Sequence, residues 1–487
     1  MHAPGQPRAT TALSLRDTRL VIVGCLLPVF MGSLDNTILA SALPTIGRGF
    51  DDAAGLPWLI TIYLLAATAG IPLYGKIADI HGRRLALRIA IAAHMAGSLI
   101  CALAPSIIVL IVGRAVQGIG GAGLSSVSVV ILGDAAAPKE RGRYYAYFSI
   151  CYTTAGACGP ALGGFLAQHL HWSAIFWLNI PLGLVAAAVT TSLLRRLPRH
   201  ERPHRLDILG ALAIITASVS FMLALNLGGR SYPWFSPPIL VLFAIALAVG
   251  AAFVLRLLTA PEPLIPIAIL INPIVRWAVI ANGFGWGSIV ALNIFLPMYL
   301  QSVIGLSPTD AGLSLMILMV SLNTSAGLAG QVLGRVRHYK LLPICMLVIA
   351  VASVAALAFW AERMTIWWFE AILFLIGIGF GPTPSLTTVV LQNAVMPHQL
   401  GIAVGTMNFS RNLFATMLIA LLGSVILGSM SAIEPAGPGQ FGGALSPAAE
   451  AAAAAFGGAF FIVAACLAVA FTALVRVEET PLRESIA

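Results

Sequence analysis

Fourteen long apolar segments divide the chain, and they restrict its possible folds more than any other feature. Each is about twenty residues long, the length an α-helix needs to cross the hydrocarbon core of a bilayer. Only 9% of the 487 residues are charged, whereas a soluble domain has about a quarter. We therefore expect an all-α integral membrane protein with spans near 20–42, 57–76, 86–104, 106–130, 144–168, 172–194, 207–227, 237–258, 277–301, 309–332, 341–360, 366–391, 402–428 and 456–476.

The distribution of Lys and Arg supports this division, because basic residues concentrate in cytoplasmic loops. If the N-terminus is cytoplasmic, only three of the 27 basic residues fall in outside loops, Arg48, Arg230 and Arg363, and two fall within spans, Arg114 and Arg411. A missed span would invert every later loop and remove this asymmetry. We predict both chain ends on the cytoplasmic side of a bacterial inner membrane. The net charge of +9 does not indicate nucleic-acid binding, since the basic residues gather on no single domain.

The order of the spans predicts three parts. Residues 1–194 form an N-terminal six-helix bundle, 195–258 a basic linker with two extra helices, and 259–487 a C-terminal six-helix bundle. The last part contains a loop at 429–455 that is rich in Gly, Pro and Ala. We expect that loop to face outside as a mobile cover or a short surface helix, and we assign it no chemistry.

The loop after the second span reads GKIADIHGRR, from Gly75 to Arg84. Gly75 and Gly82 allow close helix approach and a tight turn. Asp79 can pair with a neighbouring arginine, Arg83 or Arg84, or accept backbone amides at the start of a helix. The spacing GxxxDxxGRR between two spans is more specific than a charged turn requires.

Two spans of the first half carry buried charge. Asp35 is the carboxylate well inside a span there, and it is followed by Asn36. Arg114 lies inside the fourth span and shares one helix face with Gln117. A carboxylate in a low-dielectric site favours its neutral form, and a nearby arginine favours its charged form. Whether Asp35 and Arg114 pair could therefore decide whether Asp35 holds a proton, although a capping Asp and a snorkelling Arg are the structural alternatives.

The fifth span contains the small-residue pattern Gly156-Ala157-Cys158-Gly159-Pro160-Ala161-Leu162-Gly163-Gly164. Small residues let helices touch, and Pro160 weakens the local hydrogen-bond ladder. Gly159, Pro160, Gly163 and Gly164 are therefore expected at a close-packed bend.

These patterns together resemble the major facilitator superfamily and, within it, the fourteen-helix drug:proton antiporters. The resemblance covers nearly the whole chain. It implies two six-helix bundles plus two inserted helices, a charge latch around Asp79, a part for Arg114 in proton movement, and exchange over symport from the fifth-span pattern. The chain departs from the family at Ala155, where the first glycine of that pattern is usual, and at Phe414, where a small residue is usual.

Polar residues inside other spans are candidates for the substrate pocket, although the same residues also join helices. They are Asn36, Gln117, Asn282, Asn293, Asn323, Asn408 and Arg411. His94 is expected to be a hydrogen-bonded packing residue. The six cysteines lie within apolar stretches without metal-ligand spacing, and no phosphate-binding GxxxxGK[ST] pattern occurs, so we expect no metal, no cofactor and no enzymatic activity.

The function expected first is export of small amphipathic compounds in exchange for protons, by alternating access in a lipid bilayer. The partners are then a small-molecule substrate and protons, with a periplasmic adaptor and an outer-membrane channel as a further expectation. Uptake of a nutrient or organic acid by proton symport is the alternative within this fold. A non-transporting membrane sensor is the alternative of another class.

Overall fold

The computed structural model describes the chain outside residues 1–14, 51–55, 137, 195–206, 230–231, 307, 334–335, 337, 361–365, 397–398, 431–446 and 482–487. Apart from an isolated bridge between Gly228 and Tyr232, the regular structure of this part is helical. The helices are α1 (Leu15–Phe50), α2 (Leu56–His81), α3 (Arg83–Ala102), α4 (Ile107–Ala135), α5 (Pro138–His169), α6 (Ala174–Trp177), α7 (Asn179–Leu193), α8 (Ile208–Leu227), α9 (Pro237–Thr259), α10 (Ile267–Ile271), α11 (Pro273–Ser302), α12 (Pro308–Leu333), α13 (Leu341–Trp360), α14 (Ile366–Phe380), α15 (Pro382–Ala394), α16 (Leu400–Met430) and α17 (Pro447–Arg476).

The helices confirm the predicted all-α membrane fold. In the described part, 13 helical segments are long and apolar enough to cross a membrane. The helix α5, with 32 residues, lies between the fourth and fifth of these segments and is consistent with a fourteenth span. Even the two spans separated only by Ala104-Pro105-Ser106 are distinct, because α3 ends at Ala102 and the Ser106 hydroxyl accepts from the Val109 amide to begin α4.

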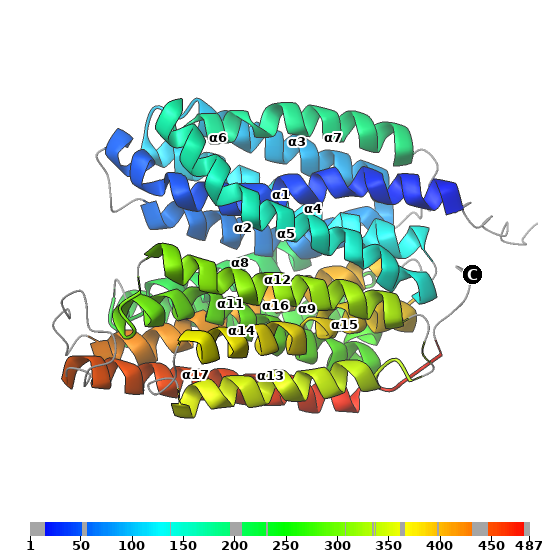
Figure 1. The fold of residues 1–487 in the computed structure, drawn as a ribbon. Coiled ribbons are helices and arrows are strands. Elements are labelled where there is room, and N and C mark those ends of the chain that lie inside the picture. Colours follow the sequence, from blue (N-terminus) through cyan, green and yellow to red (C-terminus); the bar gives the residue numbers. More distant parts are fainter. Residues whose placement is uncertain are drawn as a thin grey trace, which may run out of the picture.

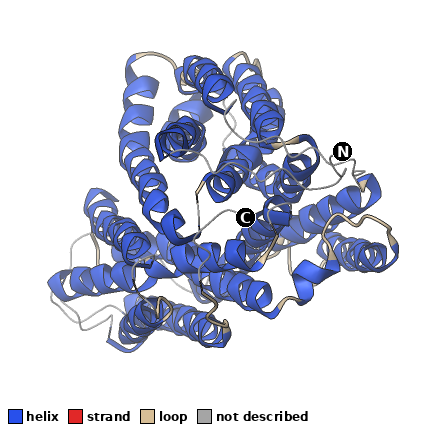
Figure 2. Ribbon diagram, turned by 90° about the vertical axis from the view of Figure 1, so that its right-hand side faces the viewer, coloured by secondary structure: helices blue, strands red, loops and turns tan. Residues whose placement is uncertain are grey.

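The helices gather into two bundles. Figure 1 shows α1 to α7 side by side in one bundle and α11 to α17 in the other, and Figure 2 shows the same helices after a rotation of 90°, many of them seen obliquely along their axes. The pair α8 and α9 stands outside this division, and α8 packs against both α2 and α16. Helix α8 therefore lies along a seam where the two bundles meet. The predicted boundaries at 194 and 258 stay predictions.

Two of the predicted spans are interrupted in the structure. The span at 172–194 is two helices that meet at Leu178, and the span at 366–391 is two helices that meet at Gly381, before Pro382. A proline lacks the amide that would continue a helix but suits its first turn.

The predicted loop at 429–455 is also wrong at both its ends. The structure is helical through Met430 and again from Pro447. Pro447 suits a first helical turn, and the alanines that follow are the best helix formers, so this composition extends a helix into the membrane edge. Residues 431–446 lie outside the described part.

Close packing of α3 on α4 positions the polar side chains in the middle of the N-terminal bundle. A Cβ atom on Gly97 would overlap the backbone nitrogen of Gln117, and one on Gly120 would overlap that of His94. The two backbones therefore touch, and side chains from both helices reach the same small volume.

Candidate functional site

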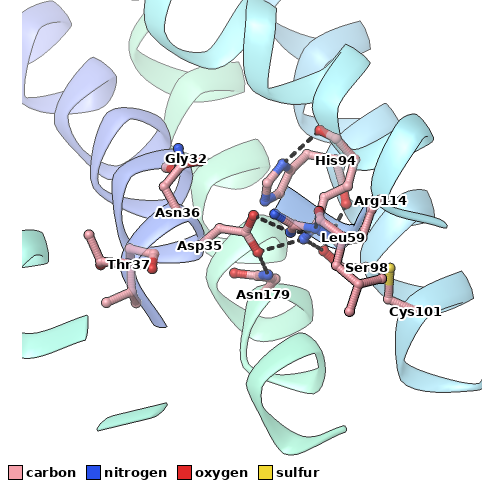
Figure 3. Close-up of polar contacts among 12 residues, drawn as sticks. Gly32, Asp35, Asn36, Thr37, Leu59, His94, Ser98, Cys101, Arg114 and Asn179 are labelled. Carbon is pink, nitrogen blue, oxygen red and sulfur yellow. Dashed lines mark hydrogen bonds and ion pairs between the residues drawn. The ribbon is translucent and has the colours of Figure 1, made fainter. Parts of the chain in front are cut away.

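A buried ion pair joins α1 to α4. Nη1 of Arg114 lies 2.7 Å from Oδ2 of Asp35, and each residue is 1% exposed. Figure 3 shows the Asp35 side chain directed away from the axis of α1 and toward the Arg114 guanidinium. The structure thus brings together the two charged residues that the sequence singled out in separate spans.

Two amides complete the surroundings of the Asp35 carboxylate. Oδ1 of Asp35 accepts from Nε2 of Gln117 at 2.7 Å and from Nδ2 of Asn179 at 3.0 Å. Both amide side chains are buried. Together with Arg114, these groups are all donors, so the geometry is that of an ionised carboxylate. We call Asp35, Arg114, Gln117 and Asn179 the charge cluster.

The guanidinium of Arg114 makes further contacts. Nη1 donates to Oε1 of Gln117 at 2.6 Å, and Nε donates to the carbonyl oxygen of Leu59 at 3.2 Å. The ring of Tyr63 lies 4.3 Å from the guanidinium carbon. A buried charge is tolerated when it is paired and hydrogen-bonded, and Arg114 is paired through Nη1 and hydrogen-bonded through Nη1 and Nε. It therefore does not snorkel to the membrane surface.

The neighbours of Asp35 on α1 lie apart from the charge cluster. Asn36 is exposed and donates to the carbonyl oxygen of Gly32 at 2.9 Å. Thr37 points to another side of α1, as Figure 3 shows, and donates to the carbonyl oxygen of Ala155 on α5 at 3.0 Å. Of the α1 residues predicted for the site, only Asp35 takes part in the cluster.

His94 and Ser98 of α3 form an outer layer around the charge cluster. Ser98 accepts from Nε2 of Gln117 at 2.8 Å and donates to the carbonyl oxygen of His94 at 2.8 Å. Nδ1 of His94 lies 3.2 Å from the carbonyl oxygen of Gln117. His94 is a buried, hydrogen-bonded residue in a helix contact, in keeping with its predicted packing role, and it does not touch Asp35 by a hydrogen bond.

A second cluster of charge connects the two bundles. Oδ1 of Asp79 accepts from the amide of Gly401 at 3.2 Å, and Oδ2 accepts from the amide of Ile402 at 2.9 Å. Nη1 of Arg83 lies 2.5 Å from Oδ1 of Asp79, and Nε of Arg83 lies 2.7 Å from Oδ2 of Asp134. Because the first turn of α16 presents unpaired amides, a carboxylate there is well placed. We call this set the interbundle latch.

The glycines of the predicted loop fit the latch geometry. A Cβ atom on Gly75 would lie 2.6 Å from the carbonyl oxygen of Gly401, so α2 and α16 cross with their backbones almost in contact. Gly82 has a φ of 86° just before α3, which an L-residue with a side chain adopts only with strain. Arg84 follows Arg83 in the first turn of α3 and is half-buried.

The small-residue pattern of α5 faces α1 at one point. A Cβ atom on Gly159 would overlap the hydroxyl of Thr37, and Gly163 is buried, whereas nothing lies within 4 Å of the Cβ position of Gly164. The helix continues through Pro160 without interruption, and the side chain of Pro160 lies outside the described part.

The remaining pocket candidates do not form one cluster. Asn282 donates to Oγ1 of Thr387 at 2.8 Å, joining α11 to α15. Asn293 and Asn323 donate to carbonyl oxygens of their own helices. Asn408 is buried in α16. The guanidinium of Arg411 lies over the ring of Trp286, 4.8 Å from its centre.

Sequence reasoning missed two features of these sites. Asn179 completes the charge cluster, and the only signal for it was a single amide in an apolar run beside Pro181. Phe414, the departure from the family pattern, fills the space left by Gly283, whose Cβ position its ring would overlap. The large Phe414 side chain on α16 therefore fits because Gly283 on α11 has no side chain.

Two helical bundles, one of which holds a buried ion pair at its centre, in a chain with these membrane spans, are the features of a multi-pass membrane transporter. A model of the Major Facilitator Superfamily matches residues 25–420, and the chain belongs to that family.

Two proteins that are similar to most of this chain are named for multidrug transport or resistance. The chain is 30% identical over 410 residues to the multidrug transporter protein MdtP of Bacillus subtilis, covering 84% of this chain and 75% of that protein. It is 28% identical over 418 residues to multidrug resistance protein 3 of the same organism, covering 85% and 81%. The human organic anion transporter MFSD10 superposes with a TM-score of 0.65 over 95% of this chain and all of that one; at 16% identity it shows the fold alone.

Proposed function

We propose that this transporter is a proton-coupled exporter of small amphipathic organic compounds, of the fourteen-helix drug:proton antiporter type. The observation that carries the proposal is the Asp35 carboxylate, which is buried between α1, α4 and α7 and is held by Arg114 and two amides. Such a group has two distinct states. Ionised, it binds Arg114; protonated, it loses the charge that holds the pair together.

Proton binding at Asp35 would act on the helices that supply the cluster. Loss of the ion pair leaves Arg114 without its counter-charge in a buried site, a state that favours rearrangement of α4 against α1 and α7. A change in those contacts would alter the packing of the N-terminal bundle against the C-terminal bundle. This gives protonation a route to the rocking motion of alternating access.

The contacts between the bundles support the assignment of the present conformation. Asp79 bonds to the start of α16, and Nε2 of Gln392 donates to the hydroxyl of Tyr145 at 3.1 Å. Farther along the helices, Nδ2 of Asn412 donates to the hydroxyl of Thr68 at 3.3 Å. These polar contacts extend from the α2–α3 turn, at Asp79, to the level of Thr68 on α2. With the α2–α3 turn in the cytoplasm, the conformation is closed to the inside.

Export rather than uptake is supported by the relatives named as multidrug transporters and by the resemblance of the Gly159-Pro160 pattern in α5 to that of antiporters. The driving force is sufficient: one charge moving across 100 mV releases about 2.3 kcal/mol, which sustains roughly a fiftyfold gradient. We further propose that the protein lies in a bacterial inner membrane with both termini cytoplasmic. The domain boundaries are proposed at 194 and 258. The proposed partners are a periplasmic adaptor and an outer-membrane channel.

A chemical screen in cells that lack their own pumps tests this function. Cells that produce the protein should resist and extrude a set of amphipathic compounds, and an uncoupler should abolish extrusion within minutes. Greater accumulation of a compound in the producing cells would instead support proton symport. Extrusion that persists with the uncoupler would contradict proton coupling, and absence of any transport would support a sensor.

A further inference from the structure

Arg411 is a second arginine inside the membrane, and it lacks the partners that Arg114 has. It lies 11 positions after Leu400, about 16 Å along α16, which is near the middle of a hydrocarbon core about 30 Å thick. Its Nε atom is buried and has no hydrogen-bond partner among the described residues. The guanidinium carbon of Arg411 lies 4.8 Å from the centre of the Trp286 ring.

The carboxylates inside the spans are engaged elsewhere. Asp35 is occupied by Arg114, and Glu370 accepts from the hydroxyl of Ser314 on α12. Within the described part, Arg411 forms no ion pair by the distances that define the others. An arginine at this depth costs several kcal/mol unless an anion or water compensates it, so Arg411 holds a positive charge that a ligand could neutralise.

A side chain from the opposite bundle locates Arg411 at the boundary between the bundles. Nδ2 of Asn412, the residue after Arg411 on α16, donates to the hydroxyl of Thr68 on α2 at 3.3 Å, and Tyr152, near the middle of α5, is within electrostatic range of Arg411. Tyr152 is nevertheless 40% exposed. The Asn412–Thr68 contact places this part of α16 against the other bundle, and a major facilitator carries its substrate between the bundles.

We infer that Arg411, Trp286 and Tyr152 form an anion-binding subsite, and that the compounds carried include aromatic carboxylates. This inference rests on the proposed function for its transport step, but its binding step stands alone. The flat guanidinium offers paired donors that fit a carboxylate, the indole offers a face for an aromatic ring, and the phenol offers a further donor. No carboxylate described here faces this position to attract an organic cation.

The inference predicts how affinity depends on ligand charge. The test measures binding to the purified full-length protein by calorimetry, without a proton gradient, using phenyl, naphthyl and anthracenyl skeletons. Each ring system carries one of three substituents: a carboxylate, a neutral hydroxymethyl group or a cationic aminomethyl group. The carboxylates should bind most tightly, and Arg411→Gln should weaken them on the order of tenfold to hundredfold while leaving the alcohols unchanged. Arg411→Lys, which keeps the charge, should recover part of the loss.

A matched control is available at Arg276, whose guanidinium also lies over a tryptophan, Trp277, at 5.2 Å, near the start of α11. Arg276→Gln should leave carboxylate affinity unchanged. Equal affinity for the three charge types, no binding of any carboxylate, or carboxylate binding unaffected by Arg411→Gln would overturn the subsite. Carboxylate binding that needs Arg411, in a protein without proton-driven export, would retain the subsite and refute the proposed function.

Discussion

Asp35 and Arg114 depend on each other because both are removed from water at the centre of the N-terminal bundle. Removing one partner of a buried pair leaves the other charge uncompensated, which typically costs about 3–5 kcal/mol, whereas replacing both can be nearly neutral. The cluster therefore has a structural role as well as the proposed role in proton coupling, and variants must separate the two.

We predict that Asp35→Asn lowers the free energy of unfolding by about 3 kcal/mol because it leaves Arg114 buried without a counter-charge. The double variant Asp35→Asn with Arg114→Gln should recover most of that loss. The measurement is the thermal unfolding midpoint of the purified protein in detergent or nanodiscs. A double variant that is less stable than Asp35→Asn would show that the two residues do not act as a pair.

The sequence is sufficient to predict part of this cluster. Arg114 and Gln117 are three residues apart and must share a face of α4, and Asp35 stands out as a carboxylate in an apolar segment. Asn179 is different, since it is 144 residues from Asp35 in the chain. Only the packing of α7 against α1 brings it there, and a single-sequence pattern contains no information about that distance.

At the scale of helices, glycines decide how closely α2 and α16 approach. A Cβ atom on Gly401 would lie 2.5 Å from the carbonyl oxygen of Gly75 and 2.6 Å from Oδ1 of Asp79, so the latch requires hydrogen at that position. One turn away, a Cβ atom on Gly405 would lie 3.4 Å from the carbonyl oxygen of Ile71, which is an ordinary contact.

We predict that Gly401→Ala shifts the population away from the present conformation, because the added methyl group forces α2 and α16 apart at the latch. The distribution of distances between spin labels on these two helices, near the α2–α3 turn, should become broader and shift to longer distances than in the parent protein. Gly405→Ala is the matched control and should leave the distribution unchanged. If both variants keep the parent distribution, the backbone contact does not hold this end closed.

Elements with strong apolar patterns were predictable, and their interruptions were not. The spans at 341–360 and 237–258 match α13 and α9 to within a residue, since length and hydropathy determine them. The interruptions at Leu178 and Gly381 lie close to Pro181 and Pro382. Whether a proline interrupts a helix depends on the packing around it, which the sequence pattern does not give. The pairing of Phe414 with Gly283 likewise requires knowing which faces of α11 and α16 meet.

For the whole molecule, the arrangement predicts that both chain ends lie on one side of the membrane. The hydroxyl of Thr18, early in α1, donates to the carbonyl oxygen of Ala135 at 3.2 Å, and Asn393, beside the α16 start, donates to Thr480 at 3.2 Å. Ala135 adjoins the latch residue Asp134. The first and last described segments therefore meet the membrane at the latch end.

We predict that cysteines introduced before α1 and after α17, in a background without the native cysteines, resist a membrane-impermeant thiol reagent in intact cells. Both should react after the membrane is opened. A cysteine near Arg230, in the connection between α8 and α9, should react in intact cells and serves as the positive control. Opposite behaviour of the two ends would require an odd number of crossings and would contradict the fold assignment.

The most direct test of the account is transport by Asp35 variants in liposomes, with a substrate taken from the cellular screen. The parent protein should concentrate the substrate against its gradient when a pH gradient is imposed and should also exchange labelled for unlabelled substrate without one. The double variant Asp35→Asn with Arg114→Gln, chosen for its balanced charge, should keep the exchange and lose the concentration step. Proton-driven concentration by that variant at the parent's rate would contradict the role of Asp35.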